Sequence, residues 1–320
     1  MRFLDAVAQA REAIAVACPG DATVWRFPGA DVLASELSLC PLRYVLHDDV
    51  TAVCTRLAFE DDTILGSSIE LVRIPAPTLW IEFVGSARHG VFADLDRLDV
   101  RANPSSRQRV GILVTADARG RRGSADVCWE NGEGLSPDLA PFTVEYDFDD
   151  EGFSERGAFS VSVSDFPALS ALFNRVRFRL RPEWHRYYAQ RAKSPDHYRD
   201  ILRRAVDPLL EDVPFLAVFC LLLSSGNALR QEPADRSRLN MARARRSRPP
   251  LLDHVELTMN LAHGNTNAVA VGERSSPRLH FVRGHLVRRG DAVHWRTSHI
   301  RGKAEVGSIR SRTVALRIAG

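Results

Sequence analysis

Residues 208–224 read Pro-Leu-Leu-Glu-Asp-Val-Pro-Phe-Leu-Ala-Val-Phe-Cys-Leu-Leu-Leu-Ser and contain the longest apolar run of the chain, Phe215 to Leu223. This run is far shorter than the roughly 20 residues needed to cross a bilayer, so it predicts a buried helix. Pro208 separates it from a second predicted helix over 195–206, and Pro214 predicts a kink. We therefore expect a helical centre that divides the strands before it from the strands after it.

The residues before this centre are mostly strand-like. A first helix is predicted over residues 3–17, ending near Pro19-Gly20, and a further helical stretch over 166–173. The segments between them are rich in Val, Leu, Ile and Thr or alternate apolar with polar side chains, and turn residues separate them. The predicted strands are residues 42–58, 63–74, 78–84, 108–116, 124–129, 157–163 and the arginine-bearing segment 175–181.

The residues after the centre begin with the polar, Arg-rich segment 231–250, which reads as a loop of a length that is usually functional or disordered. The predicted strands beyond it are residues 252–260, 268–271, 279–288, 292–297 and 313–318. This order predicts an α+β fold with an antiparallel sheet in the N-terminal half, central helices and a basic C-terminal β-hairpin region. The corresponding regions are 1–174, 175–230, 231–250 and 251–320.

The formal net charge of +3 conceals an uneven distribution. Residues 1–174 hold 27 acidic residues against 15 Arg, whereas residues 175–320 hold 13 acidic residues against 26 Arg and two Lys. The two halves therefore carry net charges of −12 and +15. A basic half predicts contact with a polyanion or an acidic partner surface, and the alternative is that the two halves neutralise each other within one fold.

Five scattered cysteines, none in a CxxC pair, are typical of reduced thiols in an intracellular protein. Acidic Asp5 and Glu12 interrupt the apolar N-terminal stretch, which a secretory signal would not contain. We expect a cytoplasmic protein without membrane contact.

The segment from Ser276 to Lys303 is the most informative for function. Gly290-Asp291 joins two alternating runs and predicts a β-hairpin, in which Phe281 and Trp295 are interleaved with arginines. Arginine with aromatic residues grips phosphates and stacks on unpaired bases, and the same surface can hold an acidic protein. In the alternative reading, both aromatic residues lie in the core beneath a solvated basic face. The candidate binding residues, including three from the Arg-rich segment, are Arg243, Arg245, Arg246, Arg278, His280, Arg283, His285, Arg288, Arg289, Trp295, Arg296, His299 and Arg301.

Motifs for chemistry are scarce. The histidines of the hairpin are spaced five apart, which puts them on opposite faces of a strand, so we expect no metal and no cofactor. No Walker A loop, GxGxxG fingerprint, GxSxG elbow or HExxH motif is present. Trp80 and Glu82 place a carboxylate beside an aromatic ring and are candidates for binding a peptide.

Four segments together resemble a group of phage and mobile-element proteins. They are Ile74–Glu82, the helix ending Leu221-Leu-Leu-Ser-Ser, the stretch Ser237–Leu252, and Arg278-Leu-His-Phe-Val-Arg-Gly-His285 followed by Trp295. The group includes the anti-CRISPR family that blocks biogenesis of the type V effector nuclease. The family pattern has Arg-Pro-His before an Arg-Arg-Gly-His core; Leu279 replaces the proline here and Val282 the first core arginine, while Arg283-Gly284-His285 is retained.

This resemblance implies a non-enzymatic protein of the host bacterial cytoplasm that recognises a nascent effector polypeptide and brings about loss of its message. From the charge split and the Arg-Gly-His hairpin, we expect the N-terminal sheet to recognise a protein or peptide. The basic C-terminal hairpin, with the Arg-rich segment 236–248, would contact RNA, a ribosome or an acidic partner. Two other functions stay open, a metal-dependent nuclease using Glu82 near His285, and a structural phage component.

Overall fold

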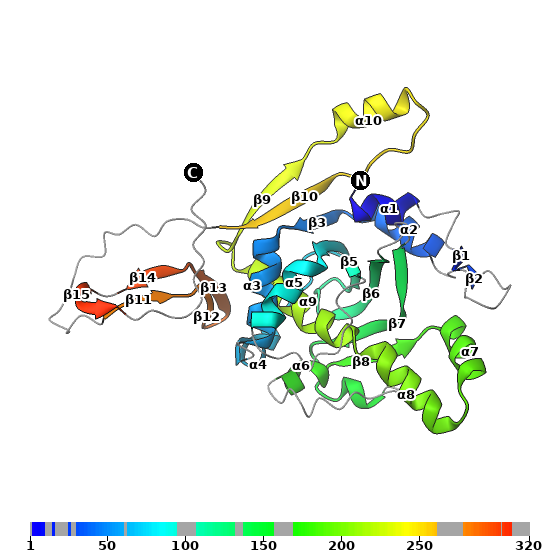
Figure 1. Cartoon of the computed structure of the whole chain (residues 1–320), viewed down its shortest axis with the longest axis horizontal. Coiled ribbons are helices and arrows are strands. Elements are labelled where there is room, and N and C mark those ends of the chain that lie inside the picture. The colour runs from blue at the N-terminus through cyan, green and yellow to red at the C-terminus, as the bar shows by residue number, and fades with distance from the viewer. Residues whose placement is uncertain are drawn as a thin grey trace.

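A computed structural model describes residues 2–9, 15–16, 25–26, 30–60, 63–94, 107–131, 137–156, 169–260, 278–301 and 303–308. Its centre is an eight-stranded sheet in the order β8-β7-β6-β5-β4-β3-β10-β9 (Figure 1). These strands are β3 (Leu42–Leu46), β4 (Thr78–Val84), β5 (Arg107–Ala116), β6 (Arg122–Asn131), β7 (Pro137–Asp147), β8 (Val176–Leu180), β9 (Leu229–Ala234) and β10 (His254–Met259).

The predicted fold class is wrong, because the sheet is mixed rather than antiparallel. Strand β3 pairs in parallel with β4 on one side and with β10 on the other, whereas the remaining pairs are antiparallel. The sheet also combines strands from both sides of the central helices, so β9 and β10 extend the same sheet as β3 to β8. The architecture is therefore α/β-like, with a small separate hairpin near the C-terminus.

The parallel pairing follows from a helical crossover that the sequence prediction missed. After β3, residues expected to continue a strand form α3 (Asp48–Phe59), and those expected to form the next strand make α4 (Thr63–Ser68) and a 3-10 turn (Ile69–Leu71). Buried Val50, Cys54 and Leu57 recur at helical spacing and face the core. Two parallel neighbouring strands need such a crossover, which α3 and α4 supply.

Helices cover the sheet on both faces. Alternation along β4 directs Leu79, Ile81 and Phe83 into the main core and Trp80 into a second, smaller one. The main core contains the apolar helix α9 (Leu209–Ser224) and residues of α3 and α5 (Gly85–Asp94). The second core holds α1 (Phe3–Gln9) and α2 (Ala30–Leu39).

Several local predictions are confirmed. Strand β4 occupies 78–84, the hairpin β5–β6 turns at 117–121, and β8 lies within the arginine-bearing segment. The helix pair is α8 (Pro195–Val206) and α9, preceded by α7 (Pro182–Arg191), and α6 (Ser170–Phe173) lies within the expected helical stretch. None of the helices in the described ranges combines the length and the apolar character needed to cross a membrane.

Other local predictions are wrong or lie outside the described residues. The helix expected to reach residue 17 is α1 only to Gln9, and β1 (Ala15–Val16) pairs with β2 (Trp25–Arg26). The expected loop 231–250 contains the end of β9 and helix α10 (Ser237–Ala244). The predicted strands at 157–163, 268–271 and 313–318 lie outside the described residues.

The C-terminal strands form two small sheets. The predicted strand 279–288 is divided into β11 (Arg278–Val282) and β12 (His285–Arg289), and β12 pairs with β13 (Ala292–Arg296) as the predicted hairpin. Strand β11 pairs with β14 (His299–Arg301) and with β15 (Lys303–Ser308). The β12–β13 hairpin packs on the main core through Leu286, Val293 and Trp295.

Candidate nucleic-acid interface

The Arg-rich segment forms a projecting arm. Strands β9 and β10 pair antiparallel over six residues each, extend beyond the sheet and carry α10 at their outer end (Figure 1). We call residues 229–259 the arginine arm. Helix α10 has no buried residue, so packing against the core does not explain its side chains. The returning side of the arm is held by the N-terminal segment, because Asp5 Oδ1 of α1 accepts the Leu252 N–H at 2.9 Å and Arg2 pairs with Glu256.

The chain beyond α10 folds into a tight, hydrogen-bonded turn, residues 245–248, which we call the arginine turn. Arg246 and Arg248 donate their backbone N–H groups to the Arg243 carbonyl at 2.9 and 3.0 Å. Ser247 has a φ of 49°, a left-handed conformation that reverses the chain. The returning segment is fixed to α10 by Asn240, whose side chain accepts the Leu251 N–H and donates to the Leu251 carbonyl.

The charge of the outer part of the arm is one-sided, whereas the rest of the arm also carries acidic residues. Residues 236–252 contain six arginines and no acidic residue. Arg243 is half-buried and donates through Nε to the Pro249 carbonyl, which orients it along the turn. Arg245 and Arg246, both predicted, are exposed, as are Arg238 and Arg248. Across the described ranges, no acidic side chain forms an ion pair with any of these four exposed arginines.

The β12–β13 hairpin presents a different situation, because its inner face is part of the core. Trp295 is only 7% exposed and belongs to the main core cluster, as the alternative reading expected of it, whereas the side chain of Phe281 lies outside the described residues. Asn227 holds its backbone on both sides, donating to the Trp295 carbonyl at 2.9 Å and accepting its N–H at 3.2 Å. Gly284 lies against this indole: a Cβ there would be 2.4 Å from Trp295 Cζ2. The Arg-Gly-His segment therefore serves docking of the hairpin.

Two predicted binding arginines are neutralised within the chain. Arg283 Nη1 lies 2.6 Å from Glu60 Oε1, and Arg288 pairs with Glu70 and donates to the Ser67 carbonyl. Hydrogen bonding to the Glu70 backbone N–H, with a smaller contribution from the Arg288 pair, holds the pKa of the Glu70 carboxyl below its ordinary value against the effect of burial. Part of the basic half therefore does meet the acidic half, as the neutralisation alternative proposed.

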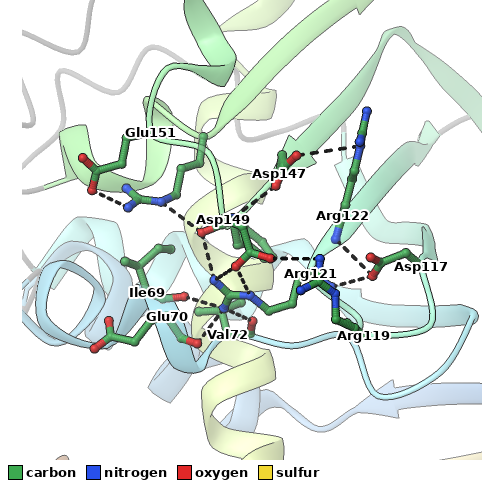
Figure 2. A network of polar contacts seen from close by, with 12 residues as sticks. Ile69, Glu70, Val72, Asp117, Arg119, Arg121, Arg122, Asp147, Asp149 and Glu151 are labelled. Carbon is green, nitrogen blue, oxygen red and sulfur yellow. Dashed lines mark hydrogen bonds and ion pairs between the residues drawn. The ribbon is translucent and has the colours of Figure 1, made fainter.

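A buried polar network fixes the backbone that carries Glu70 (Figure 2). The Arg121 guanidinium donates through Nη1 to the carbonyls of Ile69, Glu70 and Val72, and through Nη2 to that of Phe148. Its Nε lies 2.8 Å from Asp149 Oδ1. Arg121 thereby ties the turn after α4 to the β5–β6 hairpin and sets the position of Glu70 opposite Arg288.

The outer face of the hairpin remains exposed to solvent. The register pairs His285 with Arg296, Val287 with His294 and Arg289 with Ala292, and these residues point away from the core cluster. Arg289, Arg296 and His294 are exposed and His285 is half-buried, with its Nδ1 3.0 Å from the Arg283 carbonyl. This face is a second, smaller basic surface.

Four predicted residues lie in the three-stranded sheet. His280 pairs with Arg301, and His299 with Val282, across β11 and β14, and Arg278 lies opposite Lys303 of β15. Their side chains lie outside the described part of the structure.

Trp80 and Glu82 are inaccessible. Trp80 is fully buried, and Glu82, 2% exposed, accepts the backbone N–H groups of Phe3 and Leu4 at 2.9 and 2.8 Å. Burial raises the pKa of the Glu82 carboxyl, against the lowering effect of these hydrogen bonds and of Arg109. The chain's own α1 therefore occupies the position at which the sequence suggested a bound peptide.

The structure does not assemble the Glu82–His285 pair of the nuclease alternative. Glu82 faces α1 on one side of the sheet, whereas the hairpin bearing His285 packs on the core at the other side. In the described ranges, no three His, Cys, Asp or Glu residues are grouped to hold a metal ion. An interior cavity between β5–β7 and α9, lined by apolar side chains and Asp212, has a volume of about 20 Å³ and holds at most a water molecule.

Comparisons with protein-family models, with curated proteins and with solved structures found no match. Sequence reasoning named three arm arginines but missed Arg238 and Arg248, which lie in the same run, and the Asn240 and Asn227 clamps. No local pattern in the sequence indicates that the Asn240 amide binds the backbone of Leu251, eleven positions away.

Proposed function

We propose that this chain is a non-enzymatic binding protein that contacts RNA through the arginine arm, with the outer face of the β12–β13 hairpin as a second basic surface. The observation that carries the proposal is a contrast in pairing. Arg283 and Arg288 are neutralised by Glu60 and Glu70. The four exposed arginines of α10 and the arginine turn have no acidic partner in the described ranges; they are Arg238, Arg245, Arg246 and Arg248. Exposed arginines without an acidic partner, on a helix and a turn that do not pack in the core, favour an external phosphate-bearing partner.

The resemblance to the phage anti-CRISPR family supports the biological setting. On that basis we propose action in the cytoplasm of a bacterial host, on a nascent effector polypeptide carried by its ribosome. A ribosome presents RNA beside the emerging polypeptide, so one target would satisfy both parts of the proposal. The Trp80–Glu82 position is filled by α1, so this proposal assigns the polypeptide no contact there.

Binding to a fluorescently labelled structured RNA, followed by anisotropy with the full chain, tests the proposal. The variant R238A/R245A/R246A/R248A should bind at least about tenfold more weakly than the wild-type protein, because phosphate contacts dominate such affinities. These side chains are exposed, so the variant should retain the wild-type circular dichroism spectrum.

A matched control removes four other exposed arginines, each paired within the chain. R119A/R156A/R199A/R203A changes the net charge equally, and these residues pair with Asp149, Asp150, Asp196 and Asp200. The control should bind nearly as well as the wild-type protein. Equal losses in both variants would show a diffuse charge effect, and absence of RNA binding by the wild-type protein would overturn the proposal.

A further inference from the structure

The arginine arm lacks the side chains that hold unpaired bases. Residues 229–259 contain no Phe, Tyr or Trp. Proteins that bind single-stranded RNA typically stack its bases on aromatic rings, in addition to contacting phosphates. Helix α7 carries a half-buried aromatic cluster, in which Trp184 and Tyr188 pack on each other and Arg191 lies 3.7 Å over Tyr187. The arm therefore offers charge and hydrogen-bond donors without a stacking platform.

The arm is also preorganised. The arginine turn is closed by backbone hydrogen bonds from Arg246 and Arg248 to Arg243 and from Ser247 to Ala244. The Asn240 clamp at 2.8 and 2.9 Å then holds the returning chain against α10. A rigid backbone that holds its arginines at fixed positions gains affinity when the partner presents acceptors at fixed spacing, because little backbone ordering cost remains on either side. A double helix has a fixed phosphate spacing, whereas a flexible single strand does not.

We infer that the arginine arm recognises the phosphate backbone of a double-helical nucleic acid, by shape and charge rather than by base sequence. The inference deepens the proposed function and rests on it. Arg238 on the first turn of α10 and the arginines of the turn at its other end supply guanidinium groups at both ends of one short helix. Backbone contacts of this kind position a protein without reading sequence.

The test compares probes of equal phosphate number with the full-length protein. The probes are a 20-base-pair RNA duplex, its DNA counterpart, and an unstructured 40-nucleotide RNA, with lengths set at roughly the span of a double-stranded RNA-binding module. We expect binding to a duplex to be at least about tenfold tighter than to the single strand, and the R245A/R246A variant to lose most of this preference. The RNA and DNA duplexes distinguish the two sources of the same backbone chemistry.

The outcomes distinguish the double-helix inference from the proposed RNA contact. Equal or tighter binding to the single strand would overturn the double-helix inference and leave the proposed RNA contact standing. Binding to the DNA duplex alone would support the inference and overturn RNA as the partner. Binding to none of the probes, with binding to an acidic protein instead, would overturn both.

Discussion

Replacing Gly284 with alanine should loosen the β12–β13 hairpin from the core. The added Cβ would lie 2.4 Å from Trp295 Cζ2 and 2.9 Å from Cη2, where carbon atoms normally keep about 3.5–4.0 Å. The indole has little freedom to withdraw, since it is 7% exposed and Asn227 holds its backbone on both sides. The clash between the added Cβ and the indole is therefore relieved only by a shift of the hairpin or of the residues packed against it.

The free-energy cost of Gly284→Ala depends on whether the core repacks around the added methyl group or releases the hairpin. Overpacking a well-packed core by one methyl group costs about 1–3 kcal/mol. Complete release of the hairpin would expose Leu286, Val293 and Trp295, each worth roughly 1.5–3 kcal/mol of burial, so partial repacking is favoured. We expect a destabilisation of about 1–3 kcal/mol, seen as a melting temperature lower by about 1.5–4.5 °C for a chain of 320 residues.

Thermal unfolding by circular dichroism, with hydrogen exchange of the hairpin amides, measures this effect. Gly90→Ala is the matched control, because nothing lies within 4 Å of a Cβ at this position of α5. Alanine in a helix should stabilise by about 0.5–1 kcal/mol, the opposite sign. An unchanged melting temperature together with unchanged hairpin protection in Gly284→Ala would refute the docking geometry.

Three further predictions follow from other contacts. Asn240→Ala removes both hydrogen bonds to Leu251 and should weaken RNA binding in the anisotropy assay while leaving its salt dependence unchanged, since no charge is lost; a changed salt slope would contradict a positioning role. Arg121→Met leaves buried carbonyls without a donor and should lower the free energy of unfolding, measured in urea, by about 3 kcal/mol or more. The exposed Arg119→Met should have little effect, and equal effects of the two substitutions would contradict a stabilising role of the Arg121 network. Burial alone would raise the pKa of Glu145, but hydrogen bonds from Arg179 and Arg177 outweigh it and lower the pKa, so its stabilisation is present above the unfolded pKa and lost as pH falls through the folded one. Glu145→Gln should therefore lose less stability than the wild-type protein on acidification, as measured by urea unfolding, and parallel losses would exclude this linkage.

Elements whose signal is local could be predicted from the sequence. Strand β4 and the β5–β6 hairpin have alternating side chains and a turn between them, and α8 and α9 are delimited by proline. The 42–58 segment misled because its β-branched residues suggested a strand, although Val50, Cys54 and Leu57 recur at helical spacing. The pairing of β3 with β10 joins residues about 210 positions apart, and no local pattern carries that information.

The residue types of the candidate site could be predicted from the sequence, but the residues with which they form ion pairs could not. The excess of arginine in 236–248 is visible in the sequence, but the sequence did not predict that this segment forms α10 and a closed turn on a projecting arm. The charges of Arg283 and Arg288 are equally visible, whereas their neutralisation depends on Glu60 and Glu70, more than 200 residues away. Charge counting therefore located the basic half, and only the fold separated its paired arginines from its unpaired ones.

The salt dependence of duplex binding tests the central claim most directly. Each phosphate neutralised by an arginine contributes roughly 0.7–0.9 to the slope of log affinity against log salt concentration. The wild-type protein should therefore show a slope steeper by about three than R238A/R245A/R246A/R248A, whereas R119A/R156A/R199A/R203A should keep the wild-type slope. Equal slopes for the wild-type protein and the arm variant would contradict the assignment of the arginine arm as the nucleic-acid contact.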